Sequence, residues 1–127
     1  MMWLHFGRIR SGSILIVLSL ALLFCVDGAA QSVDYARQVQ PILHGRCAQC
    51  HGEEAPQGGL GLLTREGMLK GGKSGPAIVP GSSQKSLLIQ HLTGEKKPMM
   101  PMGQDPLPAS EIAVLKSWID QGAGWDT

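Results

Sequence analysis

Apolar residues recur with helical spacing along the stretch that precedes a pair of cysteines. They fall near one face of a helix and comprise Tyr35, Val39, Ile42 and Leu43. Asp34 stands where an acidic side chain favours the positive end of the helix dipole. Pro41 interrupts the stretch because it has no N–H to donate to the preceding turn. We therefore expect a kinked helix from about Val33 to Gly45.

Two shorter helices are predicted further along the chain, each bounded by capping and turn residues. Thr64 is placed to cap the first of them, and Gly71 is placed to end it. Ser82 or Ser83 is placed to cap the second, which ends at Gly94. The apolar stripe of the second helix consists of Leu87, Leu88 and Leu92.

A fourth helical stretch begins at Pro108 to Ser110 and ends at Gly122. Its apolar face consists of Ile112, Leu115, Trp118 and Ile119. We expect this helix to cross the first one and to close the fold. The whole pattern predicts an all-α domain of about four short helices.

The first thirty residues have the pattern of a signal peptide. Arg8 and Arg10 precede a short apolar run from Ile14 to Val26, and Gly28 to Ala30 offers the small residues that a signal peptidase reads. We predict cleavage after Ala30, which divides the chain into a signal peptide (1–30) and one domain (31–127). Because the run is shorter than the roughly 20 residues that span a bilayer, membrane contact is expected only if the signal is retained. The expected location is periplasmic.

Composition excludes some partners of the predicted domain. The chain has 11 Lys and Arg against 10 Asp and Glu, and removing Arg8, Arg10 and Asp27 with the signal leaves a formally neutral domain. A neutral domain with no basic patch is not expected to bind nucleic acid. Its aromatic residues are Tyr35, Trp118 and Trp125. So few bulky rings favour a core that is filled in part by an apolar cofactor.

The chemistry of the chain centres on Cys47, Cys50 and His51, which form a Cys-x-x-Cys-His motif. This spacing is that of covalent c-type haem attachment. The two thiols bond to the vinyl edge of the porphyrin, and the histidine behind the second cysteine is placed beneath the iron as an axial ligand. The motif therefore predicts one covalently bound haem c and its iron.

Other interpretations of the motif fit the surrounding sequence less well. A redox dithiol of the thioredoxin kind needs a βαβ surround, which the helical and Gly-rich flanks do not offer. A zinc ion could be bound by the motif together with His44 or His91. A structural zinc site usually has two well-spaced ligand pairs, however, and the sequence has no second pair. A disulfide between the two cysteines would close only a small loop and stabilise little. As a second iron ligand, His44 is too close in sequence to reach the opposite face, and His91 is an alternative.

A proline-rich segment supplies candidates for the second axial ligand. Met99, Met100 and Met102 lie among Pro98 and Pro101 in a polar loop, where a methionine is not expected to fill a core. A stiff, extended loop can direct a thioether towards an iron. Methionine opposite histidine raises the haem potential and occupies the position that an external ligand would need.

A Gly-rich loop from Gly71 to Gly81 is predicted to face the cofactor, because glycines let the backbone approach a flat ligand. A metal-bound histidine usually donates its other ring N–H to a carbonyl group. We predict that Pro76 supplies this carbonyl to His51. The letters from Gly67 to Ser74 also satisfy the phosphate-binding pattern G-x-x-x-x-G-K-S, but no strand precedes them and Pro76 prevents a following helix, so no nucleotide is expected.

These segments together resemble class I c-type cytochromes, and most of all the planctomycete-type cytochrome c domain. The matching stretches are Val39 to Leu43, Cys47 to Gly52, Gly71 to Gly81, Ser86 to Leu88, Met100-Pro101 with Asp105 to Leu107, and Trp118 to Ala123 with Trp125. The resemblance implies an all-α haem fold with His51 and Met100 as axial ligands. The family loop usually reads Met-Pro-Pro, and Met102 in place of the second proline keeps Met102 and Met99 as alternatives.

Domains of this family often stand at the front of large multidomain proteins, whereas this chain ends just after the domain. We therefore expect a stand-alone, monomeric electron carrier rather than an enzyme, with redox proteins as its partners. Its iron would cycle between two oxidation states while no substrate is transformed. The alternative is a haem-based sensor or a ligand-binding or docking module of an exported enzyme system.

Overall fold

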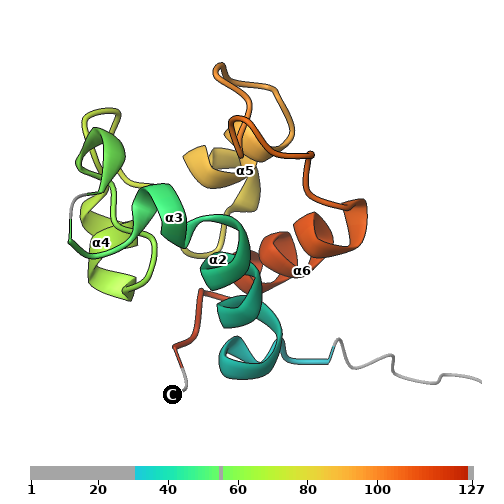
Figure 1. Cartoon of the computed structure of the whole chain (residues 1–127). Coiled ribbons are helices and arrows are strands. Elements are labelled where there is room, and N and C mark those ends of the chain that lie inside the picture. The colour runs from blue at the N-terminus through green and yellow to red at the C-terminus, as the bar shows by residue number, and fades with distance from the viewer. Residues whose placement is uncertain (1–30, 55, 126–127) are drawn as a thin grey trace, which may run out of the picture. The chain divides into compact units, whose positions relative to one another are not determined.

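The computed structural model describes residues 31–54 and 56–125 (Figure 1). Residues 32–127 belong to one compact unit. The predicted signal peptide lies outside the described residues. Within them, the regular elements are all helical, apart from one isolated bridge between Gly72 and Gly75, which confirms the predicted all-α class.

Helices and turns follow one another along the chain. They are the π-helix η2 (Tyr35–Val39), the α-helices α2 (Gln40–Arg46) and α3 (Ala48–His51), the 3-10 turn η3 (Gln57–Gly59), α4 (Arg65–Lys70), the 3-10 turn η4 (Ser83–Lys85), α5 (Leu87–Leu92) and α6 (Ala109–Asp120). The longest connections are those before η4 and before α6.

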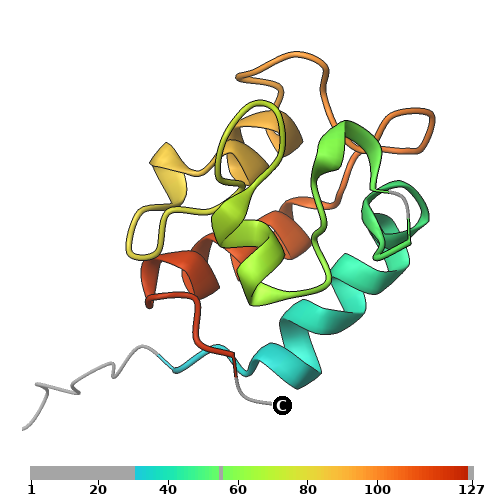
Figure 2. The ribbon, with the colours of Figure 1, turned by 90° about the vertical axis from the view of Figure 1, so that its left-hand side faces the viewer.

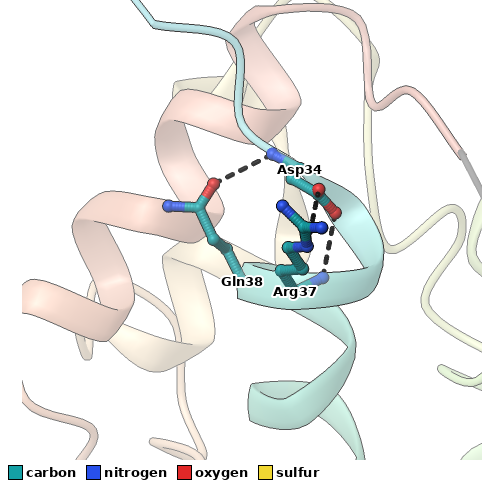
Figure 3. Close-up of polar contacts among 3 residues, drawn as sticks. All are labelled: Asp34, Arg37 and Gln38. Carbon is teal, nitrogen blue, oxygen red and sulfur yellow. Dashed lines mark hydrogen bonds and ion pairs between the residues drawn. The ribbon is translucent and has the colours of Figure 1, made fainter.

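The start of the first helix is held by side chains on its own first turn (Figure 3). An Asp34 carboxylate oxygen accepts a hydrogen bond from the backbone N–H of Arg37 at 2.9 Å. The Gln38 side-chain oxygen accepts one from the backbone N–H of Asp34, also at 2.9 Å. These bonds satisfy N–H groups that a helix start leaves without an intrahelical partner. The Asp34–Arg37 ion pair is exposed, so it contributes little.

The predicted kink at Pro41 takes the form of a change in helix type. The backbone N–H of Gln40 donates to the Tyr35 carbonyl, five residues back, which makes η2 a π-helix. Pro41 then occupies the first turn of α2, where its missing N–H costs nothing. A wide turn therefore absorbs the irregularity that proline imposes, and the buried face continues through Val39, Ile42 and Leu43.

The helix α4 begins and ends where the sequence predicts. The Thr64 hydroxyl accepts a hydrogen bond from the N–H of Gly67 at 3.0 Å, as an N-cap does. Gly71 ends the helix with a φ of 73°, a left-handed conformation that glycine adopts without strain.

The predicted cap at Ser82 or Ser83 is wrong, because α5 begins at Leu87. Ser83 instead donates its N–H and its hydroxyl to the two carboxylate oxygens of Asp120, at 2.7 and 2.9 Å. Ser86 also makes bonds outside α5: its hydroxyl donates to the Ser82 carbonyl at 2.9 Å. Ser83 therefore joins the 3-10 turn η4 to the end of α6, and the bond between Ser82 and Ser86 spans that turn.

The last helix packs against the first, as predicted. Figure 2 shows that the described part of the chain begins near the place where it ends after α6. An aromatic cluster joins the two helices. Tyr35 and Trp125 are stacked with ring centroids 3.8 Å apart, and Trp118 lies 5.7 Å from Tyr35. The Trp118 indole N–H donates to the Gly124 carbonyl at 2.7 Å, which draws the chain after α6 back over the cluster. Stacked and tilted pairs of this kind add to the stability that burial gives.

Candidate cofactor site

A single cavity of about 380 Å³ brings together residues from distant parts of the sequence. Four of the five predicted site residues line it: Cys47, Cys50, His51 and Met100. The fifth, Pro76, does not, although its neighbours Gly75 and Ala77 do. The volume lies within the range of pockets that hold organic ligands and cofactors.

One helical turn places the three residues of the motif. The carbonyl of Cys47 accepts hydrogen bonds from the N–H of Cys50 at 3.2 Å and of His51 at 2.8 Å. Residues three and four apart on a helix share a face, so both thiols and the imidazole are directed to the same side. The two thiols are free rather than joined in a disulfide. The turn therefore offers two nucleophilic sulfur atoms beside one imidazole.

The orientation of His51 is fixed by a backbone carbonyl. Its Nδ1 lies 3.0 Å from the carbonyl oxygen of Leu60. Because a carbonyl can only accept, Nδ1 carries the proton and the lone pair of the ring is on Nε2. The N–H of Leu62 donates to the His51 carbonyl at 2.9 Å, so the same loop holds both the backbone and the ring of this residue. The ring is prepared to bind a metal through Nε2.

The prediction that Pro76 orients His51 is wrong, because Leu60 occupies that position. Pro76 is exposed, and the residue after it is held elsewhere: Ala77 donates its N–H to Met68 at 2.8 Å and accepts from Leu88 at 2.9 Å. The Gly72–Gly75 bridge closes the loop on itself. The loop thus lines the cavity with Gly75 and Ala77 while Pro76 faces solvent.

The three methionines of the proline-rich segment are not equivalent. Met100 is partly buried, packs against the core and lines the cavity. Met102 also lines the cavity but is 63% exposed. Met99 is 41% exposed, is not among the lining residues and lies beside Gly94. The geometry therefore favours Met100, with Met102 second.

The two further histidines occupy different environments. His44 is exposed on α2 and does not line the cavity. His91, near the end of α5, does line it, and its Nδ1 lies 2.8 Å from the Pro98 carbonyl oxygen. His91 is therefore part of the cavity wall, a position that its sequence neighbours alone did not reveal.

The electrostatics of the cavity are those of an apolar pocket with a cationic rim. Arg46 and Lys73 are its charged lining residues, and none of the described residues that line it is acidic. Arg46 is paired with Glu111 at 3.3 Å. Burial raises the pKa of the Cys47 thiol to about 11, with Glu111 adding to the effect and Arg46 opposing it.

Two kinds of feature are absent from the described residues. No group of three or more His, Cys, Asp or Glu side chains in residues 31–54 and 56–125 is arranged to hold a metal ion. In the same part of the chain, no helix has the length and apolar character needed to cross a membrane.

Over part of its length, the chain is similar to cytochrome c-type domains, and the helical fold and the residues that line the cavity are consistent with that similarity. Residues 47–102 match the family model described as Planctomycete cytochrome C, which confirms the resemblance drawn from the sequence. The family match implies haem c as the cofactor. The cavity fits such a group, since it offers two free thiols, an imidazole with Nε2 available and largely aliphatic walls.

A curated relative is the hydrazine synthase subunit alpha of Kuenenia stuttgartiensis, which is 28% identical over 127 aligned positions. The alignment covers 76% of this chain but only 16% of that protein. No solved structure gave a significant match.

Proposed function

We propose that the chain is an exported c-type cytochrome that binds one haem covalently and transfers single electrons between redox partner proteins, without transforming a substrate. One observation carries the proposal: Met100 lines the same cavity as Cys47, Cys50 and His51, although it lies 49 residues after His51 in the sequence. The family match over residues 47–102 supports it.

The residues of the motif would attach and orient the cofactor. Each thiol would add across one vinyl group, with its sulfur bonding one carbon and its hydrogen going to the other, so that no group leaves. Nε2 of His51 would bind the iron while Nδ1–H keeps its bond to Leu60. That bond increases the basicity of the imidazole, which favours the oxidised state of the metal.

The methionine side of the cavity would set the potential and exclude external ligands. The Met100 sulfur is the candidate for the sixth position, and a thioether there raises the potential relative to a second histidine. Buried aliphatic side chains of α5, including Leu88 and Leu92, line the cavity and would shield a bound cofactor from water. A bound haem c supplies the one-electron couple itself.

Intact mass and absorption spectra of the exported protein test this proposal. The mass should equal that of a chain cleaved after Ala30 plus one haem, and the reduced spectrum should be low-spin and insensitive to carbon monoxide. Met100→Ala should lower the potential and open the iron to carbon monoxide, whereas Met99→Ala should leave both unchanged. A mass without haem would contradict the proposal, and an unchanged spectrum of Met100→Ala would transfer the ligand to Met102.

A second candidate is a haem module that serves an exported enzyme system, which the alignment with an enzyme subunit favours. Such a module would bind carbon monoxide rapidly if it senses a small molecule. It would show no accessible redox couple if its haem is structural. A reversible one-electron couple without ligand binding would exclude both forms.

A further inference from the structure

The end of α5 is joined to the proline-rich segment, taken as residues 95–103, by three hydrogen bonds, two of which involve His91. The carbonyl of His91 accepts from the N–H of Met100 at 3.0 Å. The His91 ring contacts the Pro98 carbonyl through Nδ1 at 2.8 Å. One residue earlier, the Gln90 carbonyl accepts from the N–H of Lys96 at 2.9 Å. Figure 1 shows the segment leaving α5 and arching beside it before the chain reaches α6.

We propose that His91 is a positioning residue that holds Met100 against the cavity. This inference rests on the proposed function, because it gives the ring of His91 a task in presenting the candidate sixth ligand. Nδ1 must donate, since the Pro98 carbonyl can only accept. The backbone of His91 fixes the N–H of Met100 itself, while its side chain fixes the carbonyl two residues before it.

The segment depends on hydrogen bonds from α5 because its own sequence limits the backbone hydrogen bonds that it can make. Pro98 and Pro101 on either side of Met100 have no N–H to donate, and the segment forms no helix of its own. Most of its side chains are exposed, so burial holds it only where Met100 packs against the core. A hydrogen bond from a neighbouring helix therefore has more influence here than in a regular element.

Direct binding of iron by His91 is the competing role, and an asparagine substitution separates the two. The asparagine amide nitrogen occupies nearly the position of Nδ1, so His91→Asn retains a donor for Pro98 but provides no imidazole. Glutamine places its amide nearer the position of Nε2, so His91→Gln is expected to lose the bond to Pro98. His91→Leu removes every hydrogen-bond donor of the side chain and retains an apolar side chain.

The experiment uses the haem-loaded protein, with covalent loading checked by intact mass. The readouts are the sulfur-to-ferric-iron charge-transfer absorption and the rate of carbon monoxide binding to the reduced form. Loss of one net hydrogen bond predicts a roughly three- to tenfold faster rate in His91→Leu and His91→Gln, with a weaker absorption band. His91→Asn should stay near the parent, as should the control His44→Leu, which alters an exposed histidine outside the cavity.

Each outcome distinguishes this inference from the proposed function. If the unsubstituted protein lacks the sulfur-to-ferric-iron absorption band, no methionine binds the iron. That result would contradict both the role of His91 and the proposed sixth ligand. If the unsubstituted protein has the band and His91→Leu leaves the band and the rate unchanged, only the positioning role of His91 is contradicted. The same follows if His91→Asn is as impaired as His91→Leu. If His91→Leu does not accumulate, the comparison of His91→Asn with His91→Gln still decides.

Discussion

Nδ1 of His51 and the carbonyl oxygen of Leu60 lie 3.0 Å apart, and the backbone that makes this contact is packed against Gly72. A Cβ atom on Gly72 would lie 2.6 Å from the Gly58 oxygen, 3.0 Å from the Leu60 Cβ and 3.1 Å from the Leu60 nitrogen. Real Cβ atoms hardly ever approach a backbone atom so closely. The absence of a side chain at Gly72 is therefore a condition for the placement of the Leu60 carbonyl.

Gly72→Ala is expected to displace Leu60 and weaken its hydrogen bond to His51. The imidazole would then donate less electron density to the iron, the oxidised state would lose stabilisation, and the reduction potential would rise. Redox titration of the loaded protein measures the change. Gly45→Ala is the matched control, because nothing lies within 4 Å of a Cβ there and alanine favours the helix α2. An equal shift in both variants would contradict the explanation.

Gly71→Ala should destabilise the domain far more than Gly81→Ala. Both residues have a left-handed φ, of 73° and 82°, which costs alanine roughly 1 kcal/mol. A Cβ on Gly71 would also collide with the backbone of Gly75 and Pro76, whereas one on Gly81 has nothing within 4 Å. We expect a loss of more than about 3 kcal/mol for Gly71→Ala and about 1 kcal/mol for Gly81→Ala. Urea unfolding curves would show equal losses if packing at Gly71 were unimportant.

Asp120→Ala should lower the free energy of unfolding by about 1–3 kcal/mol, because it removes a charged acceptor from two donors. Both donors belong to Ser83, which is only 4% exposed and would keep its N–H and hydroxyl without these partners. Thermal unfolding measures the loss. Asp105→Ala, at an exposed aspartate in the segment between α5 and α6, is the control and should change little. Two equally stable variants would show that the contact is energetically neutral.

Alkaline pH should destabilise the domain through Tyr35. Burial raises the pKa of this phenol from 10.0 to about 12. Since the folded state binds the proton more tightly than the unfolded state, the stability contribution is complete below pH 10 and is lost as pH rises towards 12. Tyr35→Phe should remove this part of the decline in stability. Parallel pH profiles of the two proteins would contradict the assignment.

The sequence predicted those elements whose signals are local. The cap at Thr64, the stop at Gly71 and the break at Pro41 each depend on the intrinsic conformational properties of one residue and its neighbours, and the structure has all three. The gathering of the Cys-x-x-Cys-His motif and Met100 at one cavity followed from the requirements of one cofactor. These predictions needed no knowledge of how the helices pack.

The wrong predictions concern contacts that depend on a backbone atom or on a residue distant in the sequence. Any residue has a carbonyl group, so nothing in the sequence marks Leu60 rather than Pro76 as the partner of His51. The serines at the start of α5 satisfy a capping pattern, but Asp120 is bound by Ser83 across the fold. The cavity position of His91 likewise depends on how α5 packs, so the sequence alone offered this histidine only as an alternative ligand.

The pairing of the first and last helices has a consequence for modular architecture. The N–H of Val33 donates to the Gln121 side chain at 2.8 Å, and Trp125 stacks on Tyr35, so the described stretch starts and finishes at one place. None of these residues lines the cavity. A unit whose two ends meet away from its binding site can be inserted into a longer polypeptide, or joined to another unit, while that site stays intact.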